Sequence, residues 1–172
     1  MAEIQVRLAT DPSDYEAARR LCEEWLDWHW RHYPTDWPRG ADHPMDPAGF
    51  KAILTDLPEL HKRPEGGVLI AWLDGEPAGC VMYRKAGPCV AEFNRMFVSE
   101  TGRGNGLGGK LLSRLFEQLV ADRYESVFFS SATFLNHARI MYENAGFVPM
   151  PHPQGFPDLW RDKVYFMERS LV

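Results

Sequence analysis

The stretch RGNGLGGK at residues 103–110 is the part of this sequence whose residue types and spacing most directly indicate chemistry. Four glycines lie between the cations Arg103 and Lys110. Because glycine has no Cβ atom, a ligand can approach the main-chain N–H groups of such a turn closely, and N–H groups at the start of a helix attract anions. The stretch therefore predicts a site at which backbone amides bind phosphate.

Two familiar phosphate-binding patterns fit this stretch poorly. Gly104, Gly106 and Gly109 match the dinucleotide pattern G-x-G-x-x-G, but the chain ends too soon after them for the doubly wound domain that this pattern requires. Gly104, Gly109 and Lys110 also match G-x-x-x-x-G-K, but Leu111 stands where a Ser or Thr should bind magnesium. The sequence therefore disfavours a reductase that uses NAD and a kinase that uses ATP.

A third pattern, R-x-x-G-x-G, is formed by Arg103, Gly106 and Gly108. Together with the sequence around it, this pattern resembles the acetyl-CoA signature of the GNAT N-acetyltransferase superfamily. The similarity covers most of residues 68 to 170, and an ordered set of segments is more specific than one glycine motif. The similar segments are AEFNRMFVS at 91–99, RGNGLGG at 103–109, LL at 111–112, NHAR at 136–139, MYE at 141–143, AGF at 145–147 and YFMER at 165–169.

The resemblance implies an N-acetyltransferase that moves an acetyl group from acetyl-CoA to a primary amine by direct attack on the thioester. Whether the acceptor is a small molecule, a peptide N-terminus or a lysine stays open. The implied GNAT acyl-CoA N-acyltransferase fold is α+β, with a mixed, mostly antiparallel twisted sheet of about six to seven strands flanked by about four helices. We expect a single such domain over residues 1–172. A non-catalytic acyl-CoA-binding module of the same fold is the alternative.

The resemblance also implies which residues bind acetyl-CoA, which acts as a co-substrate without a metal. The pantetheine arm is expected to pair with the strand that contains Met96, Phe97 and Val98, where a main-chain N–H group would face the thioester oxygen. Asn136 is expected to bind the cofactor or to cap a helix. The remaining expected cofactor residues are Arg103, Gly104, Asn105, Gly106, Leu107, Gly108, Gly109, Lys110 and Tyr142.

Two residues are candidates for the catalytic steps. Tyr142 matches the tyrosine that, in this family, can protonate the departing sulfur, although it also lies on an apolar stripe of helical spacing typical of a core. An amine substrate arrives protonated and needs a base. Glu92 is the leading candidate, and a surface glutamate paired with a basic neighbour is the alternative. His29, His32 and His152 are further candidates for a base or a pocket wall, or are packed imidazoles.

The acceptor side is expected to involve Trp28, Tyr33 and Arg95. In this family the first helices and the loop before the last strand frame the acceptor site, so Trp28, Trp30, Tyr33 and Trp37 would form an aromatic wall for it, or would attach this helix and the proline-rich segment to the sheet. Arg95 is expected to have a structural or a substrate-side role. Asn94 stands where many relatives carry a basic residue.

Periodicity and turn signals predict the elements that position these residues. Ser13 and Glu16 form a capping box that opens a long helix ending before Pro34. The expected helices cover about 13–33, 46–57, 107–122 and 136–146, and the expected strands cover about 4–8, 68–73, 78–84, 90–98, 126–130, 147–150 and 163–170.

Bulk composition limits the class of partner. The chain has 172 residues, a net charge of -5 and three cysteines without metal-site spacing. A mildly acidic chain of this kind is not typical of a nucleic-acid or membrane-surface protein. No signal pattern and no apolar run of about 20 residues is present, so we expect a cytoplasmic protein. Homodimers are common in the family that the chain resembles, which makes a homodimer an open expectation.

Overall fold

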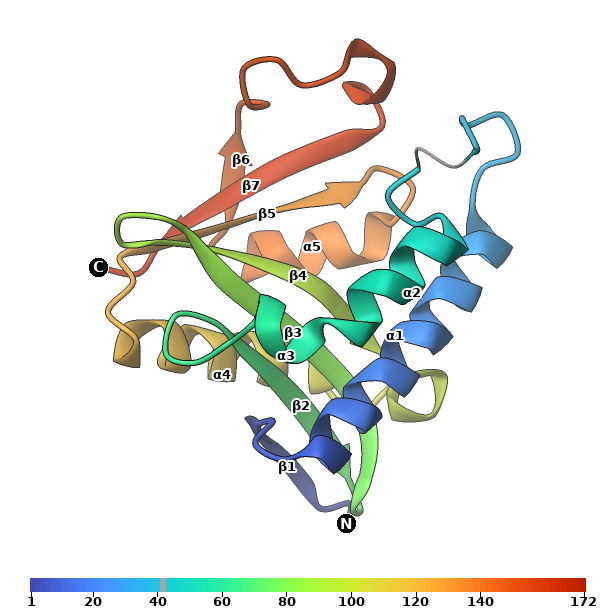
Figure 1. Cartoon of the computed structure of the whole chain (residues 1–172). Coiled ribbons are helices and arrows are strands. Elements are labelled where there is room, and N and C mark those ends of the chain that lie inside the picture. The colour runs from blue at the N-terminus through green and yellow to red at the C-terminus, as the bar shows by residue number, and fades with distance from the viewer. Residues whose placement is uncertain (41–42) are drawn as a thin grey trace.

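The computed structural model describes residues 1–40 and 43–172. Within these residues, seven strands form one sheet in the order β1-β2-β3-β4-β5-β7-β6, and α-helices cover both of its faces (Figure 1). Only β4 and β5 pair in parallel; the other neighbours are antiparallel. The predicted α+β fold with a mostly antiparallel sheet is confirmed. The strands are β1 (Ile4–Leu8), β2 (Gly67–Leu73), β3 (Glu76–Gly87), β4 (Val90–Val98), β5 (Ser126–Ala132), β6 (Val148–Met150) and β7 (Val164–Ser170).

The helices differ from the expectation mainly in the segment before β2. One helix was expected over 46–57, but the chain forms α2, ends it at Thr55 and begins the single turn α3 at Leu57. The described residues therefore contain five α-helices rather than about four. They are α1 (Pro12–His32), α2 (Pro47–Thr55), α3 (Leu57–Leu60), α4 (Leu107–Ala121) and α5 (Asn136–Asn144), and two 3-10 turns cover Glu100–Gly102 and Asp158–Trp160.

The alternation of side chains along the strands creates two cores. On β2, Leu69 packs with α4 and α5 on one face, whereas Val68 and Ile70 pack with α1 and α2 on the other. Both faces of the central strands are covered, so these strands are apolar almost throughout. The leucines of α4 recur at helical spacing and are fully buried. The sheet is thus a rigid layer between two helical layers.

The start of α1 corrects the predicted capping box. The N-cap is Asp11, whose side chain accepts a hydrogen bond from the Asp14 N–H group, and Pro12 occupies the first helical position. Asp14 is buried and accepts two hydrogen bonds from the Arg7 guanidinium on β1, at 2.8 and 3.0 Å. The capping box at Ser13 is therefore wrong, because an aspartate with proline after it is a stronger helix start two residues earlier.

The parallel strands β4 and β5 separate partway along their length. Their paired residues run only from Val90 opposite Ser126 to Glu92 opposite Phe128. Beyond Glu92, β4 continues for six residues to Val98, while β5 continues to Ala132 and stays paired with β7 on its other edge, as it is along its whole length. The edge of β4 that faces β5 thus lacks a strand partner over this half, which opens the sheet at its centre.

Candidate active site

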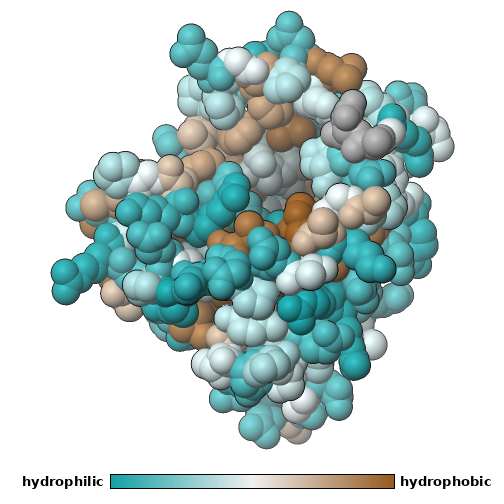
Figure 2. Space-filling view, viewed as in Figure 1, coloured by the Kyte–Doolittle hydropathy of each residue, from teal (hydrophilic) through white to brown (hydrophobic). Residues whose placement is uncertain are grey.

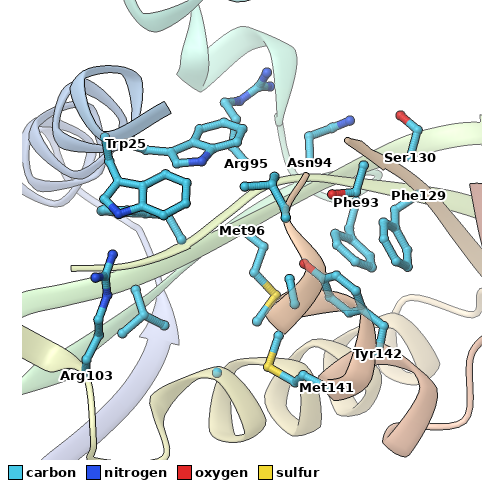
Figure 3. Close-up of a pocket in the computed structure, with 17 residues that line it drawn as sticks. Trp25, Phe93, Asn94, Arg95, Met96, Arg103, Phe129, Ser130, Met141 and Tyr142 are labelled. Carbon is cyan, nitrogen blue, oxygen red and sulfur yellow. The ribbon is translucent and has the colours of Figure 1, made fainter. Parts of the chain in front are cut away.

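A cavity of about 220 Å³ lies where β4 and β5 separate. Four elements and the glycine turn line it, and Figure 3 shows side chains from opposite sides converging on it. In the space-filling view, the molecule is hollowed near the carboxyl end of β5, with apolar side chains at the bottom (Figure 2). The lining residues are Trp25, Trp28, Phe93, Asn94, Arg95, Met96, Phe97, Val98, Arg103, Gly108, Phe129, Ser130, Ser131, Leu135, Ala138, Met141 and Tyr142.

A β-bulge at Arg95 shapes the β4 side of this cavity. Arg95 has a φ of +50°, and the pairing of β4 with β3 shifts register there. Phe93 and Phe97 are four residues apart, so they would lie on the same face of a regular strand. Because of the extra residue at the bulge, Phe93 packs in the core beneath α4 whereas Phe97 packs in the core beneath α1. The bulge therefore reverses which face of β4 the residues after it occupy, and it turns Met96 toward the cavity side.

The side chain of Arg95 points away from the cavity (Figure 3). Its Nη2 atom lies 2.7 Å from Nε2 of the buried His61, whose Nδ1 atom lies 2.9 Å from the Tyr83 carbonyl oxygen. Burial lowers the pKa of His61 to about 4, so this imidazole is neutral and Nε2 can accept a hydrogen bond from the guanidinium. Of the two roles expected for Arg95, this geometry supports the structural one.

The glycine turn leads from β4 to α4 without side chains in the way. Gly104 and Gly106 have φ values of +82° and +70°, and a Cβ atom on either would meet nothing within 4 Å. Gly106 is the N-cap of α4, and no side chain satisfies the first N–H groups of this helix. Exposed N–H groups at a helix start form a site that fits an anion. Arg103, also exposed, lies with its guanidinium over the Trp28 ring at 5.7 Å.

The predicted phosphate-binding residues do not all face the same space. Arg103 and Gly108 line the cavity, whereas Gly106, Gly109 and Lys110 line a separate groove beside Ile4 on β1. The Leu107 side chain is buried in the core, so only its main chain is available to a ligand. The Asn105 amide donates to the Gly102 and Arg103 carbonyl oxygens, at 3.1 and 3.3 Å, and so holds the turn in shape.

Tyr142 lines the cavity from α5. Its side chain is buried, its hydroxyl group makes no hydrogen bond to another described residue, and it points toward Met96 on β4 (Figure 3). Its ring also packs against Phe129, at a centroid distance of 4.2 Å. Tyr142 therefore belongs to the core and to the cavity wall together. Burial raises its pKa, so the hydroxyl group stays protonated and can donate.

Glu92 and Asn136 lie outside the cavity. The Glu92 carboxylate accepts hydrogen bonds from Arg84 Nη2 at 3.0 Å and from Asn94 Nδ2 at 3.2 Å. Glu92 is thus paired with a basic neighbour, as the alternative to a catalytic role predicted, and the geometry offers no support for Glu92 as a base. Asn136 is exposed at the first position of α5, where no side chain caps the helix. The capping role of Asn136 is therefore wrong, while its cofactor role stays a prediction.

A second cavity, of about 450 Å³, adjoins the first. The two share Trp25 on α1, Ser130 and Ser131 on β5, and Leu135. Of the expected acceptor residues, Trp28 lines the first cavity and Tyr33 lines the second. The remaining residues that line the second cavity are His29, Trp37, His43, Pro44, Met45, Ala132, Phe134, Phe156, Pro157, Trp160 and Val164.

The sequence reasoning missed several lining residues. Trp25 stands three residues before Trp28, and this helical spacing was a signal that both face the same way. Ser130, Ser131 and Leu135 carry no such signal, because their position depends on how β5 separates from β4.

The part of the chain that the structure describes contains neither a metal-ligand cluster nor a membrane-spanning helix. Over residues 1–40 and 43–172, no three His, Cys, Asp or Glu side chains come together as metal ligands. Over the same ranges, no helix combines the length and the apolar character needed to cross a bilayer.

Comparison with known proteins gives a family for this chain. The sequence profile of the Acetyltransferase (GNAT) family matches residues 22–147. No curated protein matches the sequence at a significant level.

Solved structures give the same fold. A GNAT acetyltransferase from Staphylococcus aureus Mu50 superposes with a TM-score of 0.75 at 17% identity, covering 99% of this chain and 100% of that one. The PaiA N-acetyltransferase from Thermoplasma acidophilum, solved in complex with coenzyme A, has a TM-score of 0.70 at 13% identity and covers 98% and 99%. The ribosomal-protein-S18-alanine N-acetyltransferase from Escherichia coli has a TM-score of 0.66 at 14% identity and covers 99% and 94%. At these identities the likeness concerns the fold.

Proposed function

The chain belongs to the Acetyltransferase (GNAT) family, and we propose that it transfers an acetyl group from acetyl-CoA to a primary amine by direct attack on the thioester. One observation carries this proposal. The cavity between the separated strands is lined at one side by Arg103 and Gly108, next to the open turn at Gly104 and Gly106, and Tyr142 lines it from α5. The turn expected to bind phosphate, a strand edge without a partner and a tyrosine hydroxyl group thus lie close to one another.

The residues present fit a coenzyme A thioester. The turn at Gly104 and Gly106 leaves room where side chains would stand, and Arg103 adds a positive charge for the diphosphate. The free edge of β4 offers main-chain groups for the amides of the pantetheine arm, as an added strand would. Support also comes from the PaiA relative of the same fold, which was solved with coenzyme A.

Acetyl-CoA supplies an already activated acyl group, so the chain has to position an amine and stabilise charge. A main-chain N–H group near Phe97 or Val98 would donate to the thioester oxygen, and a donor of this kind contributes about 3 kcal/mol in well-measured enzymes. The protonated Tyr142 would donate to the sulfur as the C–S bond breaks. Arg95 would have a positioning role, because its contact with His61 holds the bulge that orients the second half of β4.

Ligand-induced stabilisation and product formation test this proposal together. Acetyl-CoA and CoA should raise the melting temperature, because a ligand at 100 times its Kd adds about 2.7 kcal/mol of stability, whereas ATP and NAD should not. Incubation with acetyl-CoA and a panel of primary amines should release free CoA. Stabilisation by ATP alone would contradict the proposal.

Reversing the charge at Arg103 tests where the diphosphate binds. Arg103→Glu should weaken acetyl-CoA binding by about tenfold or more, because it replaces attraction by repulsion. Arg20→Glu is the matched control, since Arg20 is an exposed arginine on α1 that lines neither cavity. Equal affinities of the two variants, measured by calorimetry, would show that the diphosphate lies elsewhere.

A further inference from the structure

The second cavity has the size and the walls of a small-molecule site. Its volume of about 450 Å³ lies within the range of ligand pockets, roughly 300 to 1,000 Å³. Aromatic rings dominate its walls: Trp37 and Phe134 meet edge to face at 5.4 Å, and Trp160 and His43 do so at 5.3 Å. Such walls exclude water and favour a flat apolar body.

The charge of these walls narrows the class of ligand. Among the described residues that line the second cavity, none is Asp, Glu, Lys or Arg. Two cations lie against rings of the wall, Arg39 over Tyr33 at 4.9 Å and Lys163 over Trp37 at 6.0 Å. Among residues 1–40 and 43–172, a ligand with several positive charges would find no carboxylate partner in this wall and would lie near two like charges, which disfavours polyamines and lysine-rich peptides.

His29 is a polar group in this apolar space. It is 5% exposed, and neither its Nδ1 nor its Nε2 atom has a hydrogen-bond partner within the described ranges 1–40 and 43–172. Its ring lies among aromatic neighbours, with Phe134 at 5.4 Å and Tyr33 at 5.3 Å. Buried polar groups in native proteins nearly always have partners, and an unpaired one costs stability. A ligand that donates to this imidazole would remove that cost.

The first and second cavities share part of their walls, and this shared border indicates how a ligand in the second cavity would be oriented. Trp25, Ser130, Ser131 and Leu135 border both spaces, so a molecule seated in the second cavity can reach the first along this border. His29 lies one helical turn beyond Trp25 on α1. An amine near this border is therefore close to His29 and to the cavity that holds Tyr142.

We propose that the second cavity is the acceptor site, that its substrate is a primary amine carried on an aromatic or similarly apolar body, and that the His29 imidazole accepts a hydrogen bond from that amine. This inference rests on the proposed acetyl transfer. The apolar body lies among Tyr33, Trp37, Phe134 and Trp160, and the amine points along the border toward the thioester.

A panel of acceptors tests the substrate class. With acetyl-CoA as donor, 2-phenylethylamine and tryptamine should have values of kcat/KM at least tenfold above those of spermidine, ethanolamine and a lysine-containing peptide. If spermidine or the peptide is preferred, acetyl transfer stands and the acceptor inference fails. If no amine is acetylated and acetyl-CoA does not stabilise the protein, the proposed function itself fails. A preference for long acyl chains on CoA, with no preference among amines, would assign the cavity to the acyl group and overturn the inference.

Variants of His29 test its role in binding the amine, measured independently of acetyl transfer. In CoA-bound protein, titration with 2-phenylethylamine followed by tryptophan fluorescence should give a Kd that rises about tenfold in His29→Phe and less in His29→Gln, whose amide can still accept. Acetyl-CoA binding should be unchanged in both. An unchanged amine Kd in folded His29→Phe would overturn the role of His29.

A pair of tryptophan variants, one in the aromatic wall of the second cavity and one outside it, tests where the apolar body binds. Trp37→Leu should weaken 2-phenylethylamine binding by about tenfold, whereas Trp72→Leu, on β2 and outside both cavities, should leave it unchanged. Thermal unfolding of each variant shows whether it is folded. Equal binding by Trp37→Leu and Trp72→Leu would contradict the placement of the apolar body.

Discussion

At the scale of the residue, Tyr142 serves two environments with one side chain. Its ring packs on Phe129 and Phe93 in the core, while its hydroxyl group faces the cavity between β4 and β5 (Figure 3). A tyrosine in a core normally finds a partner for its O–H group within the protein. Among the described residues, the hydroxyl groups of both Tyr142 and Tyr165 lack such a partner, but only Tyr142 lines the cavity, and this distinguishes it from an ordinary core residue.

Removing the Tyr142 hydroxyl group separates catalysis from binding. Tyr142→Phe should lower kcat by about 100-fold, in line with the loss of a general acid, while the acetyl-CoA Kd stays the same. Tyr165→Phe is the matched control, because Tyr165 is also buried near Phe129 but lines neither cavity. Steady-state kinetics and calorimetry measure the two quantities. Full activity of Tyr142→Phe would instead favour an acyl-CoA site in which this tyrosine only packs.

At the scale of the element, the far end of α4 is tied to the chain before β2. Asp122, the C-cap residue of α4, accepts hydrogen bonds from both terminal nitrogens of Arg63, at 2.5 and 2.7 Å, and from the Tyr83 hydroxyl group at 2.5 Å. The Asp122 side chain is 7% exposed. This cluster fixes α4 against β3, and the start of α4 is the expected diphosphate site.

Breaking this cluster should weaken the whole domain without touching the active site. Asp122→Ala removes the carboxylate that accepts from Arg63 and from the buried Tyr83 hydroxyl group, so the free energy of unfolding should fall by about 2 kcal/mol. Asp158→Ala, at a carboxylate that is 98% exposed, should change it by less than about 0.5 kcal/mol. Urea unfolding at pH 7 measures both, and equal stabilities would show that the cluster contributes little.

At the scale of the whole molecule, buried histidines connect stability to pH. Burial lowers the pKa of His43 as well as the pKa of His29 and of His61, and for these last two the pKa falls from 6.5 to about 4. In the folded chain both imidazoles stay neutral down to about pH 4, whereas the unfolded chain binds their protons below about pH 6.5. The unfolded state therefore binds more protons in this window.

The free energy of unfolding should accordingly be constant above pH 6.5 and fall as the pH drops toward 4, by on the order of 3 kcal/mol for each histidine. Urea unfolding at several pH values between 7.5 and 4.5 measures this slope. His29→Phe should make the slope shallower, because one of the buried neutral imidazoles is removed. A stability that does not vary across this range would contradict the burial of these neutral imidazoles.

The sequence by itself determined the family, the fold class and the positions of most strands and helices. These follow from local patterns: alternation in β2, helical spacing in α4, and the glycine turn after β4. Local patterns also singled out Arg103 and Tyr142, and both residues line the cavity between β4 and β5. The prediction was wrong where two local signals compete. Ser13 was expected to cap α1, but the N-cap is Asp11.

Only the tertiary structure decided how the site is enclosed. The pairing of Glu92 with Arg84, the bulge that turns the Arg95 side chain toward His61, and the border shared by Trp25 and Ser130 join residues from different elements. No spacing rule along the chain predicts such contacts, because they arise where β4 and β5 separate and three layers pack around the gap. The second cavity depends on that packing and not on any single segment.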